Sequence, residues 1–594
     1  MKKLKKIVLV LLVMSLLINP MYLTLRVHAA NEELATSRIS DTLRSVMKNS
    51  AEEKIQIIIW LNDINASAEK LTSTKAILAQ AKAISAPRGL CEASTTDAAI
   101  YSQYMAERKE VLKEYYQEYT QNFSNSYLNE NEVLYSSKYV AAIIAELTRS
   151  RINDIAALPV VSSIDYYNDT IQESGSVNSN ARYEIIGDDL YNTVAEIMHG
   201  YGIDDLLEHI DTQGEGVSIG ILDKETPDLS HPMFGNNITL HYADPLGMHL
   251  NTHPTHIFEI LYSILPDADY YYTTYWNTED IAGVRTNLAN EIEWLLDNNV
   301  DVISCSQHLY SHPNKYADYD DNYNDYGSIA RYLDEIITNY GVIFVTSAGN
   351  QPHAGIASGG MSYNAITVGN YNIRQNTISE YSAYYTGSDW AYKPDICAPG
   401  YYSFVTTELE DCGTSYATPI VAAMAALILI DSNYMLLSYD VKSIICAGAS
   451  RMLYSINDPN YRIYGAGVID GSYVASILQN NTYNYNYLSP NEDEHSYTIY
   501  LDGWTIPSFA LSFEYSDTGS NNYVIGDLDL FLYDPNGNLV ASSQTTQNNV
   551  ELIRFEEDYS GWYTLVVEQV TPPEEGGTDT YVFYSVAWYI SEYD

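Results

Sequence analysis

The sequence has 594 residues, and its 77 acidic and 30 basic side chains give a formal net charge of −47. Hydrophobic residues make up 46% of the chain, so packed cores are expected and a largely disordered chain is not. The length excludes a single small domain, and the negative charge argues against partners such as nucleic acid or anionic lipid.

The first 29 residues have the pattern of a secretory signal peptide. Four lysines within 2–6 precede an apolar run over 7–18, and residues 27–29 supply the small side chains expected before a cleavage point. A retained anchor is the less favoured alternative, because the run is shorter than the ~20 residues of a membrane span. We expect a secreted, extracellular protein without stable membrane insertion, and attachment to the cell surface stays open.

Residues 55–166 predict strands and helices in the order βαββαβ. The strand patterns lie at 57–61, 133–136, 140–147 and 160–166, and the helical compositions lie at 68–119 and 149–158. This order is that of a ferredoxin-like unit. Pro87 and Gly89 interrupt the first helical region, which predicts two helices or an insertion there. We assign the unit to a domain over 30–175.

The pattern over 176–485 is that of an α/β domain. Short apolar strands, predicted at 217–222, 302–305, 342–346 and 365–368, alternate with helices that include 291–296 and 329–338. Strands this apolar are covered on both faces, so we expect a parallel sheet with helices on both faces. Reactive groups then belong at the carboxyl ends of the strands.

The last domain, 490–594, is predicted to be a β-sandwich. Alternating patterns at 527–533, 562–567 and 581–588 accompany a turn at 534–538. This region has no catalytic combination of residues, and a binding module and a stabilising cap are equally compatible with it.

The cysteines and acidic loops do not predict a metal site. Cys305, Cys397, Cys412 and Cys446 lack metal-ligand spacing and are too few for a disulfide scaffold, so we expect buried free thiols. The acidic stretch 318–325 lacks the glycine and closing glutamate of an EF-hand loop, which favours a solvated loop.

Four polar residues follow predicted strands or lie in turns. Asp223 follows 217–222, His253 lies in Thr-His-Pro-Thr-His, Asn350 ends Ser-Ala-Gly-Asn, and Ser415 lies in Gly-Thr-Ser-Tyr-Ala-Thr-Pro. Asp, His and Ser are the groups of an acyl-transfer triad, because a hydroxyl nucleophile needs a neutral imidazole to take its proton and a carboxylate to orient that imidazole.

The neighbours of the histidine and serine predict how they are placed. Ser415 begins an apolar stretch and should sit at the N-terminus of a buried helix, where backbone N–H groups favour an oxyanion. Pro254 suits a first helical turn, which predicts His253 at a helix start with an exposed ring. His253 and His256 as a metal pair is the alternative, but a His-Glu-x-x-His signature is absent, so a packing role for His256 is favoured.

These segments, with Lys-Pro-Asp-Ile-Cys-Ala-Pro-Gly at 393–400, resemble the subtilisin-like serine proteases, or subtilases. The resemblance implies a subtilisin-like fold in which Asp223 is the acid, His253 the base and Ser415 the nucleophile. It further implies Asn350 as the oxyanion donor. Ser306 and Gly349 are candidates for substrate binding.

By the same resemblance, the chain is expected to be a serine endopeptidase for protein or peptide substrates, made as an autoprocessed zymogen. The pro-domain over 30–175 would assist folding and act as an intramolecular inhibitor until cut within 169–180. No cofactor or metal is expected for the chemistry, and a structural calcium ion is compatible with the family, with ligands unassigned. The alternatives are a catalytically inactive binding protein of the same fold and a serine hydrolase that acts on non-peptide acyl groups. The family usually has glycine where this chain has Pro254 and His308.

Overall fold

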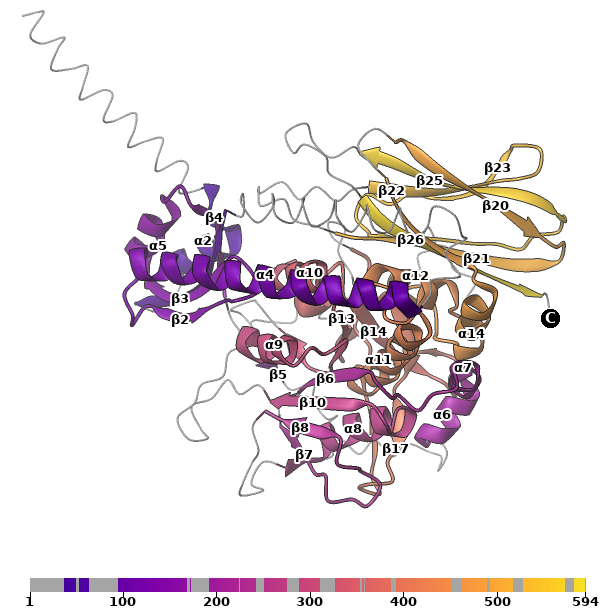
Figure 1. Ribbon diagram of the computed structural model, residues 1–594, viewed down its shortest axis with the longest axis horizontal. Coiled ribbons are helices and arrows are strands. Elements are labelled where there is room, and N and C mark those ends of the chain that lie inside the picture. Colours follow the sequence, from indigo (N-terminus) through magenta and orange to yellow (C-terminus); the bar gives the residue numbers. More distant parts are fainter. Residues whose placement is uncertain are drawn as a thin grey trace, which may run out of the picture.

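The structure is a computed structural model, viewed in Figure 1. It describes residues 37–49, 53–62, 95–167, 171–172, 192–223, 225–241, 250–274, 288–309, 326–352, 355–356, 358–385, 391–450, 461–488, 492–515, 527–571 and 582–592. The predictions for the signal segment, for Pro87 and Gly89, and for the acidic stretch 318–325 lie outside these residues.

The N-terminal unit is a four-stranded antiparallel sheet with helices against it, at the left of Figure 1. Its strand order, β2-β3-β1-β4, and its chain order are those of a ferredoxin-like unit. The long helix extends further than the predicted 119. The elements are α2 (Asp41–Asn49), β1 (Lys54–Leu61), α4 (Thr95–Tyr127), β2 (Val133–Ser136), β3 (Ala142–Thr148), α5 (Arg149–Ala156) and β4 (Val161–Tyr166).

The central domain is built on one sheet with the strand order β15-β14-β13-β11-β6-β10-β8, and β16 lies beside β14. Its strands pair in parallel apart from β15, which is antiparallel to β14. This confirms the predicted parallel sheet, with boundaries shifted by one residue at most, apart from the end of the strand predicted at 365–368, which lies four residues later. The strands are β6 (Ser218–Asp223), β8 (Ile238–Leu240), β10 (Asp269–Thr274), β11 (Val302–Cys305), β13 (Ile343–Ser347), β14 (Ile366–Asn372), β15 (Thr377–Ile378) and β16 (Ile396–Pro399).

Helices cover both faces of this sheet because its strands are apolar on both sides. One core joins the sheet to α7 (Ile203–Ile210), α8 (Thr252–Ile264) and α11 (Thr414–Asp431). A second core, on the other face, joins it to α9 (Leu288–Asp297) and α10 (Ser328–Tyr340). Among the described residues, α11 is the one helix long and apolar enough to qualify as a membrane span, and 89% of it is buried inside the protein.

The C-terminal region forms two four-stranded antiparallel sheets, β19-β26-β21-β24 and β20-β25-β22-β23, around a core of their own. This is the predicted β-sandwich, although β19 lies before the predicted start at 490. The strands are β19 (Tyr483–Leu488), β20 (Glu494–Leu501), β21 (Thr505–Phe513), β22 (Asp527–Tyr533), β23 (Leu539–Ser543), β24 (Val550–Arg554), β25 (Gly561–Thr571) and β26 (Val582–Glu592).

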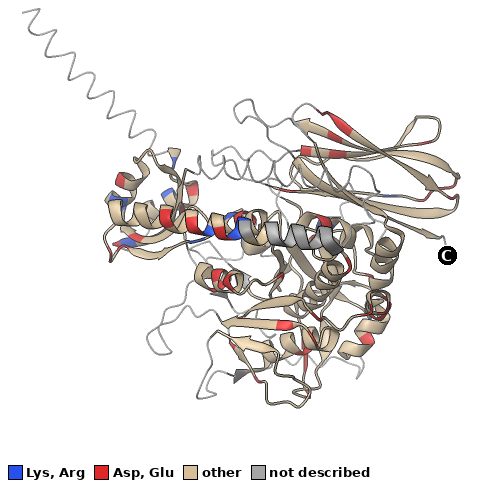
Figure 2. Cartoon of the chain, in the orientation of Figure 1, with Lys and Arg blue, Asp and Glu red and all other residues tan. Residues whose placement is uncertain are grey.

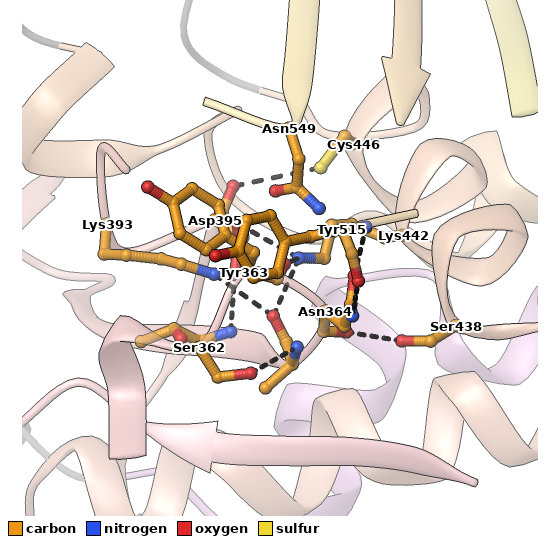
Figure 3. Close-up of polar contacts among 12 residues, drawn as sticks. Ser362, Tyr363, Asn364, Lys393, Asp395, Ser438, Lys442, Cys446, Tyr515 and Asn549 are labelled. Atoms are coloured by element: carbon orange, nitrogen blue, oxygen red, sulfur yellow. Dashed lines mark hydrogen bonds and ion pairs between the residues drawn. The ribbon is translucent and has the colours of Figure 1, made fainter. Parts of the chain in front are cut away.

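A buried polar cluster lies where the central domain meets the sandwich (Figure 3). The Lys393 ammonium contacts Asp395 Oδ2 at 2.7 Å, and the Lys442 ammonium lies 3.5 Å from Asp395 Oδ1. Beside them, the Asn364 side chain donates to the Tyr515 carbonyl at 2.8 Å and accepts from the Tyr515 N–H at 2.9 Å. One amide side chain therefore binds the backbone of the sandwich as a neighbouring strand would.

The four cysteines of the central domain are free and buried, as predicted. Burial raises the pKa of the Cys305 and Cys446 thiols to about 12, which keeps them protonated and unreactive.

Candidate active site

Asp223 ends β6, which lies between β10 and β11 in the middle of the sheet. Its side chain is 1% exposed, and the Gln307 Nε2 amide donates to its Oδ1 at 2.7 Å. This bond fixes Oδ1 of the carboxylate. The other oxygen, Oδ2, lies toward the start of α8.

His253 lies in the first turn of α8, as predicted from Pro254. The Asn251 side chain caps this helix by accepting from the His253 N–H at 3.0 Å. His253 Nδ1 lies 3.1 Å from Asp223 Oδ2. The prediction of an exposed ring is wrong, since the side chain is 14% exposed and lies against the Tyr416 ring at a centroid distance of 5.4 Å.

The environment of His253 shifts its pKa in two directions. Burial lowers the pKa, and the carboxylate of Asp223, with smaller contributions from Asp411 and Glu225, outweighs burial and raises it above 6.5. The protonated imidazole that forms when a base accepts a proton is therefore stabilised at this position.

His256 is a packing residue rather than a second functional imidazole. Its ring stacks on Phe404 at a centroid distance of 3.7 Å, and its Nε2 lies 2.7 Å from Thr407 Oγ1. Burial lowers its pKa to about 3, so the ring is neutral. Within the part of the chain that the structure describes, no group of three or more His, Cys, Asp or Glu side chains is arranged to hold a metal.

Ser415 is the second residue of α11, so it lies at the N-terminus of the buried helix as predicted. Its Oγ donates to the Ser306 carbonyl at 3.0 Å, and the Ser306 hydroxyl donates to the Ser415 carbonyl at 2.9 Å. The N-terminal end of a helix presents backbone N–H groups and a partial positive charge, which suit an oxyanion. Tyr416, the next residue, contacts the His253 ring, which brings serine and histidine to one place.

Asn350 follows β13 and faces the start of α11. Its Oδ1 accepts from the Thr414 N–H and from the Thr414 hydroxyl, each at 2.8 Å. Both bonds use the oxygen, so the donor end of the amide is turned toward Gly413. A side chain at Gly413 would place its Cβ 3.0 Å from Asn350 Nδ2, and glycine there keeps the donor end clear.

The two candidate substrate-binding residues flank this arrangement. Ser306 follows β11 and touches Ser415 directly. Gly349 has φ of +116°, a conformation that favours glycine, and its N–H donates to Thr414 Oγ1 at 3.2 Å. The structure thus brings all six predicted residues to the same edge of the sheet.

A short strand pair lies beside Ser306. β5 (Ile171–Gln172), which follows the N-terminal unit, pairs antiparallel with β12 (His308–Leu309). His308 pairs with Gln172, and Leu309 pairs with Ile171. The chain therefore adds its own strand to the edge of the site.

Sequence reasoning missed the residues that position the predicted ones. Gln307 donates to Asp223 and Thr414 donates to Asn350. Tyr416, whose ring contacts His253, donates from its hydroxyl to Asp411 at 2.6 Å. Gln307 and Thr414 are neighbours of Ser306 and Ser415, so adjacency was a signal that they lie near the site. It gave no indication of which side chain each would bind.

The subtilase family model matches residues 214–467. Among solved structures, the prenylagaramide maturation protease PagA is 19% identical, with 47% of this chain and 98% of that chain covered and a TM-score of 0.37. The patellamide maturation protease PatA is 18% identical, with 45% and 98% covered and a TM-score of 0.35.

Proposed function

Since residues 214–467 form a domain of the subtilase family, we propose that this protein is a serine endopeptidase that uses Asp223, His253 and Ser415 as its triad. The observation that carries the proposal is the Asp223–His253 contact of 3.1 Å beside a serine at the start of a buried helix. An acid, a base and a hydroxyl nucleophile are the groups that acyl transfer needs.

Asp223 orients His253 through Nδ1, so that Nε2 of the ring is the basic nitrogen. Ser415 Oγ attacks the scissile carbonyl as His253 accepts its proton, and the same proton is then given to the leaving amine. Water repeats the sequence on the acyl-enzyme and releases the acid product. The raised pKa of His253 favours the imidazolium that each half of the reaction forms.

Asn350 and the backbone N–H of Ser415 are the proposed oxyanion donors. Thr414 holds the Asn350 oxygen in place before substrate binds. The amide therefore needs little reorientation when the oxyanion forms. Loss of one such donor typically lowers turnover by about 10²–10³.

The pairing of β5 with β12 supports a zymogen whose own chain occupies the substrate edge. His308 pairs with Gln172 in an antiparallel register. If the uncut chain keeps this register beyond Gln172, the residue two positions later would pair with Ser306, whose carbonyl accepts from Ser415 Oγ. That residue is Ser174 in the sequence. We therefore expect autoprocessing between Ser174 and Gly175, within the 169–180 stretch predicted from composition.

The test compares residues 30–594 with the Ser415→Ala form of the same chain by intact mass and by casein hydrolysis. The wild type should acquire Gly175 as its N-terminus and cleave casein, whereas Ser415→Ala should stay whole and inactive. If neither form is cut or cleaves casein, the inactive binding protein is the better account. Hydrolysis of simple esters without hydrolysis of peptides would instead favour the non-peptide hydrolase.

The pH profile of the processed enzyme gives a second test. Because His253 acts as a base only when neutral, kcat/KM should rise with pH through a value above 6.5. A flat profile between pH 5 and 9 would contradict the assignment of His253. Secretion and a structural calcium ion stay predictions, and for calcium the test is whether a chelator lowers the unfolding temperature.

A further inference from the structure

An exposed group of aromatic side chains lies on the C-terminal sandwich, which the proposed catalysis does not use. Tyr500, Trp504, Tyr559 and Trp562 are 45%, 69%, 76% and 62% exposed, and we refer to these four as the aromatic patch. Within the described residues, no other aromatic side chain among the exposed large hydrophobic ones is as open as these. Isolated exposed rings are ordinary on a surface, but a group of them marks an interaction site.

The four residues are neighbours in the fold. Tyr500 on β20 pairs directly with Trp562 on β25, and their ring centroids are 5.2 Å apart in an edge-to-face arrangement. Trp504 lies in the turn between β20 and β21, and Tyr559 lies in the loop that leads into β25. The two connections are joined, since the Trp504 N–H donates to the Glu557 carbonyl at 2.6 Å.

The backbone holds the patch in place. Gly503 donates from its N–H to the Ser560 hydroxyl at 2.8 Å, and the Tyr559 N–H donates to Glu557 Oε1 at 2.8 Å. Trp504 has φ of +66°, which is uncommon for a bulky side chain and is kept by these connections. Rings presented on a fixed backbone lose little conformational entropy when a partner binds.

The patch faces away from the central domain. It lies on the β20-β25-β22-β23 sheet and its loops, whereas β21 and β26 of the other sheet contact α12 (Ser438–Ala447) of the central domain (Figure 1). A partner on the patch therefore meets no obstruction from that domain.

The surroundings of the patch are acidic. Asp502, Glu556 and Asp558 are exposed and lie between or beside its aromatic residues in the sequence. Arg554 is the only lysine or arginine after Arg462, and its side chain is buried. In Figure 2 acidic residues are visible on β22 and β25 of the sandwich. Anionic partners, including a second copy of this sandwich, are repelled from such a surface.

We propose that the aromatic patch is a docking site for lysine- or arginine-rich segments of a partner protein. Cationic side chains bind over the faces of tryptophan and tyrosine, and arginine also pairs with carboxylates such as Asp502 and Asp558. Exposed rings and carboxylates in one place thus recognise a cationic polypeptide in two ways. If the protein is the protease proposed above, the patch would hold cationic substrates near it, but the docking itself does not depend on catalysis.

The test uses the full chain carrying Ser415→Ala, so that a peptide is bound and not cut. A fluorescently labelled arginine nonamer is titrated and followed by anisotropy, beside glutamate and serine nonamers. The arginine nonamer should bind most tightly, and Trp504→Ala with Trp562→Ala should weaken it about tenfold. Tyr127→Ala is the matched control, because Tyr127 is 44% exposed on the N-terminal unit and should leave binding unchanged.

A second variant separates the rings from the charge. Asp502→Asn with Asp558→Asn should weaken binding about threefold and reduce its salt dependence. Equal binding by the double tryptophan variant and the control would show attraction to net charge alone and overturn the proposal. Equal binding of the serine nonamer, or a dimer of the chain that the tryptophan substitutions abolish, would overturn it as well. Unchanged unfolding temperatures would show that the variants are folded. Because the test measures binding to the Ser415→Ala chain, its outcome does not depend on whether the protein is a protease.

Discussion

The N-terminal unit and the C-terminal sandwich both bury apolar side chains against the central domain, but they use charge differently. At the N-terminal interface, charged groups pair with charged groups as well as with neutral ones. The Asp297 carboxylate contacts the Lys113 ammonium at 2.7 Å and also pairs with Lys138. At the C-terminal interface, the Lys393 and Lys442 ion pairs with Asp395 stay within the central domain, and Arg554 of the sandwich reaches across to neutral groups, the Ala466 and Cys446 carbonyls.

The apolar parts of the two interfaces differ in extent as well. Ala510, Val550, Leu552 and Ala587 of the sandwich belong to the same core as α8 and α11. The N-terminal unit contributes side chains such as Trp60 and Ile144 to the smaller core over α9 and α10. Partly exposed ion pairs stabilise an interface little, because water solvates both charges when it opens, whereas exposing apolar surface to water is unfavourable. The comparison suggests an N-terminal unit that can be released and a sandwich that stays.

The largest effect is expected at Arg554. Replacing it with methionine takes a donor from the buried Ala466 carbonyl and one of the donors from the Cys446 carbonyl, and should lower the free energy of unfolding by about 3 kcal/mol. The measurement is chemical denaturation of the Ser415→Ala chain. Arg374→Met is the control, because Arg374 is exposed. A loss under about 0.5 kcal/mol would remove the basis for a permanently docked sandwich.

A smaller effect is expected at Glu293 in α9, which faces the N-terminal unit. Its carboxylate accepts from Tyr135 at 2.6 Å, from Ser137 at 2.5 Å and from Tyr332 at 2.9 Å. Glu293→Ala should destabilise the uncut chain by about 2 kcal/mol, since it strands buried hydroxyl groups.

The processed enzyme tests whether that effect belongs to the interface. Once the N-terminal unit has been removed, Glu293→Ala should leave kcat/KM unchanged. An equal loss of stability in processed and uncut forms would mean that Glu293 supports the central domain itself.

Asp297→Asn should cost about 1 kcal/mol in the uncut chain, because the ion pairs it loses are partly exposed. The Asp297 side chain is 28% exposed, and Lys113 and Lys138 are similarly open. The cost should shrink as salt is raised, and the cost of Arg554→Met should not. Equal salt dependence of the two variants would end the distinction between the interfaces.

A change in the pH dependence of stability is expected at Asp440 in α12, beside the sandwich. Burial raises its pKa to about 8, with a smaller contribution from the Glu514 charge. A pKa raised by folding stabilises the folded state at low pH, and this stabilisation is lost as pH rises from about 4 toward 8. Asp440→Asn should flatten the decline in unfolding free energy across that window. A slope unchanged by the substitution would show that other groups cause it.

Much of the fold could be predicted because it depends on local patterns. The apolar run at 302–305 became β11 without a shift in its bounds, and the βαββαβ order appeared as a four-stranded sheet. The triad candidates were recognisable because each lies in a short motif, such as the glycine, threonine and serine at 413–415.

The placement of those candidates was harder to predict. His253 was expected to be exposed, but Tyr416, from a distant part of the sequence, covers its ring. Asn350 was identified as a donor, but the orientation of its amide depends on Thr414. Such contacts depend on how separate segments meet once the sheet has formed, and periodicity carries no information about that.

The sequence by itself determined the chemistry available to this protein, because side-chain type and local pattern fix which groups end a strand or begin a helix. Tertiary structure decided how the groups are used. It paired Asp223 with His253, set Gln172 beside His308, and brought the residues of the aromatic patch together. The physical reason is that helix and strand formation depends on neighbours along the chain, whereas distances between distant residues are fixed only when sheets and cores close.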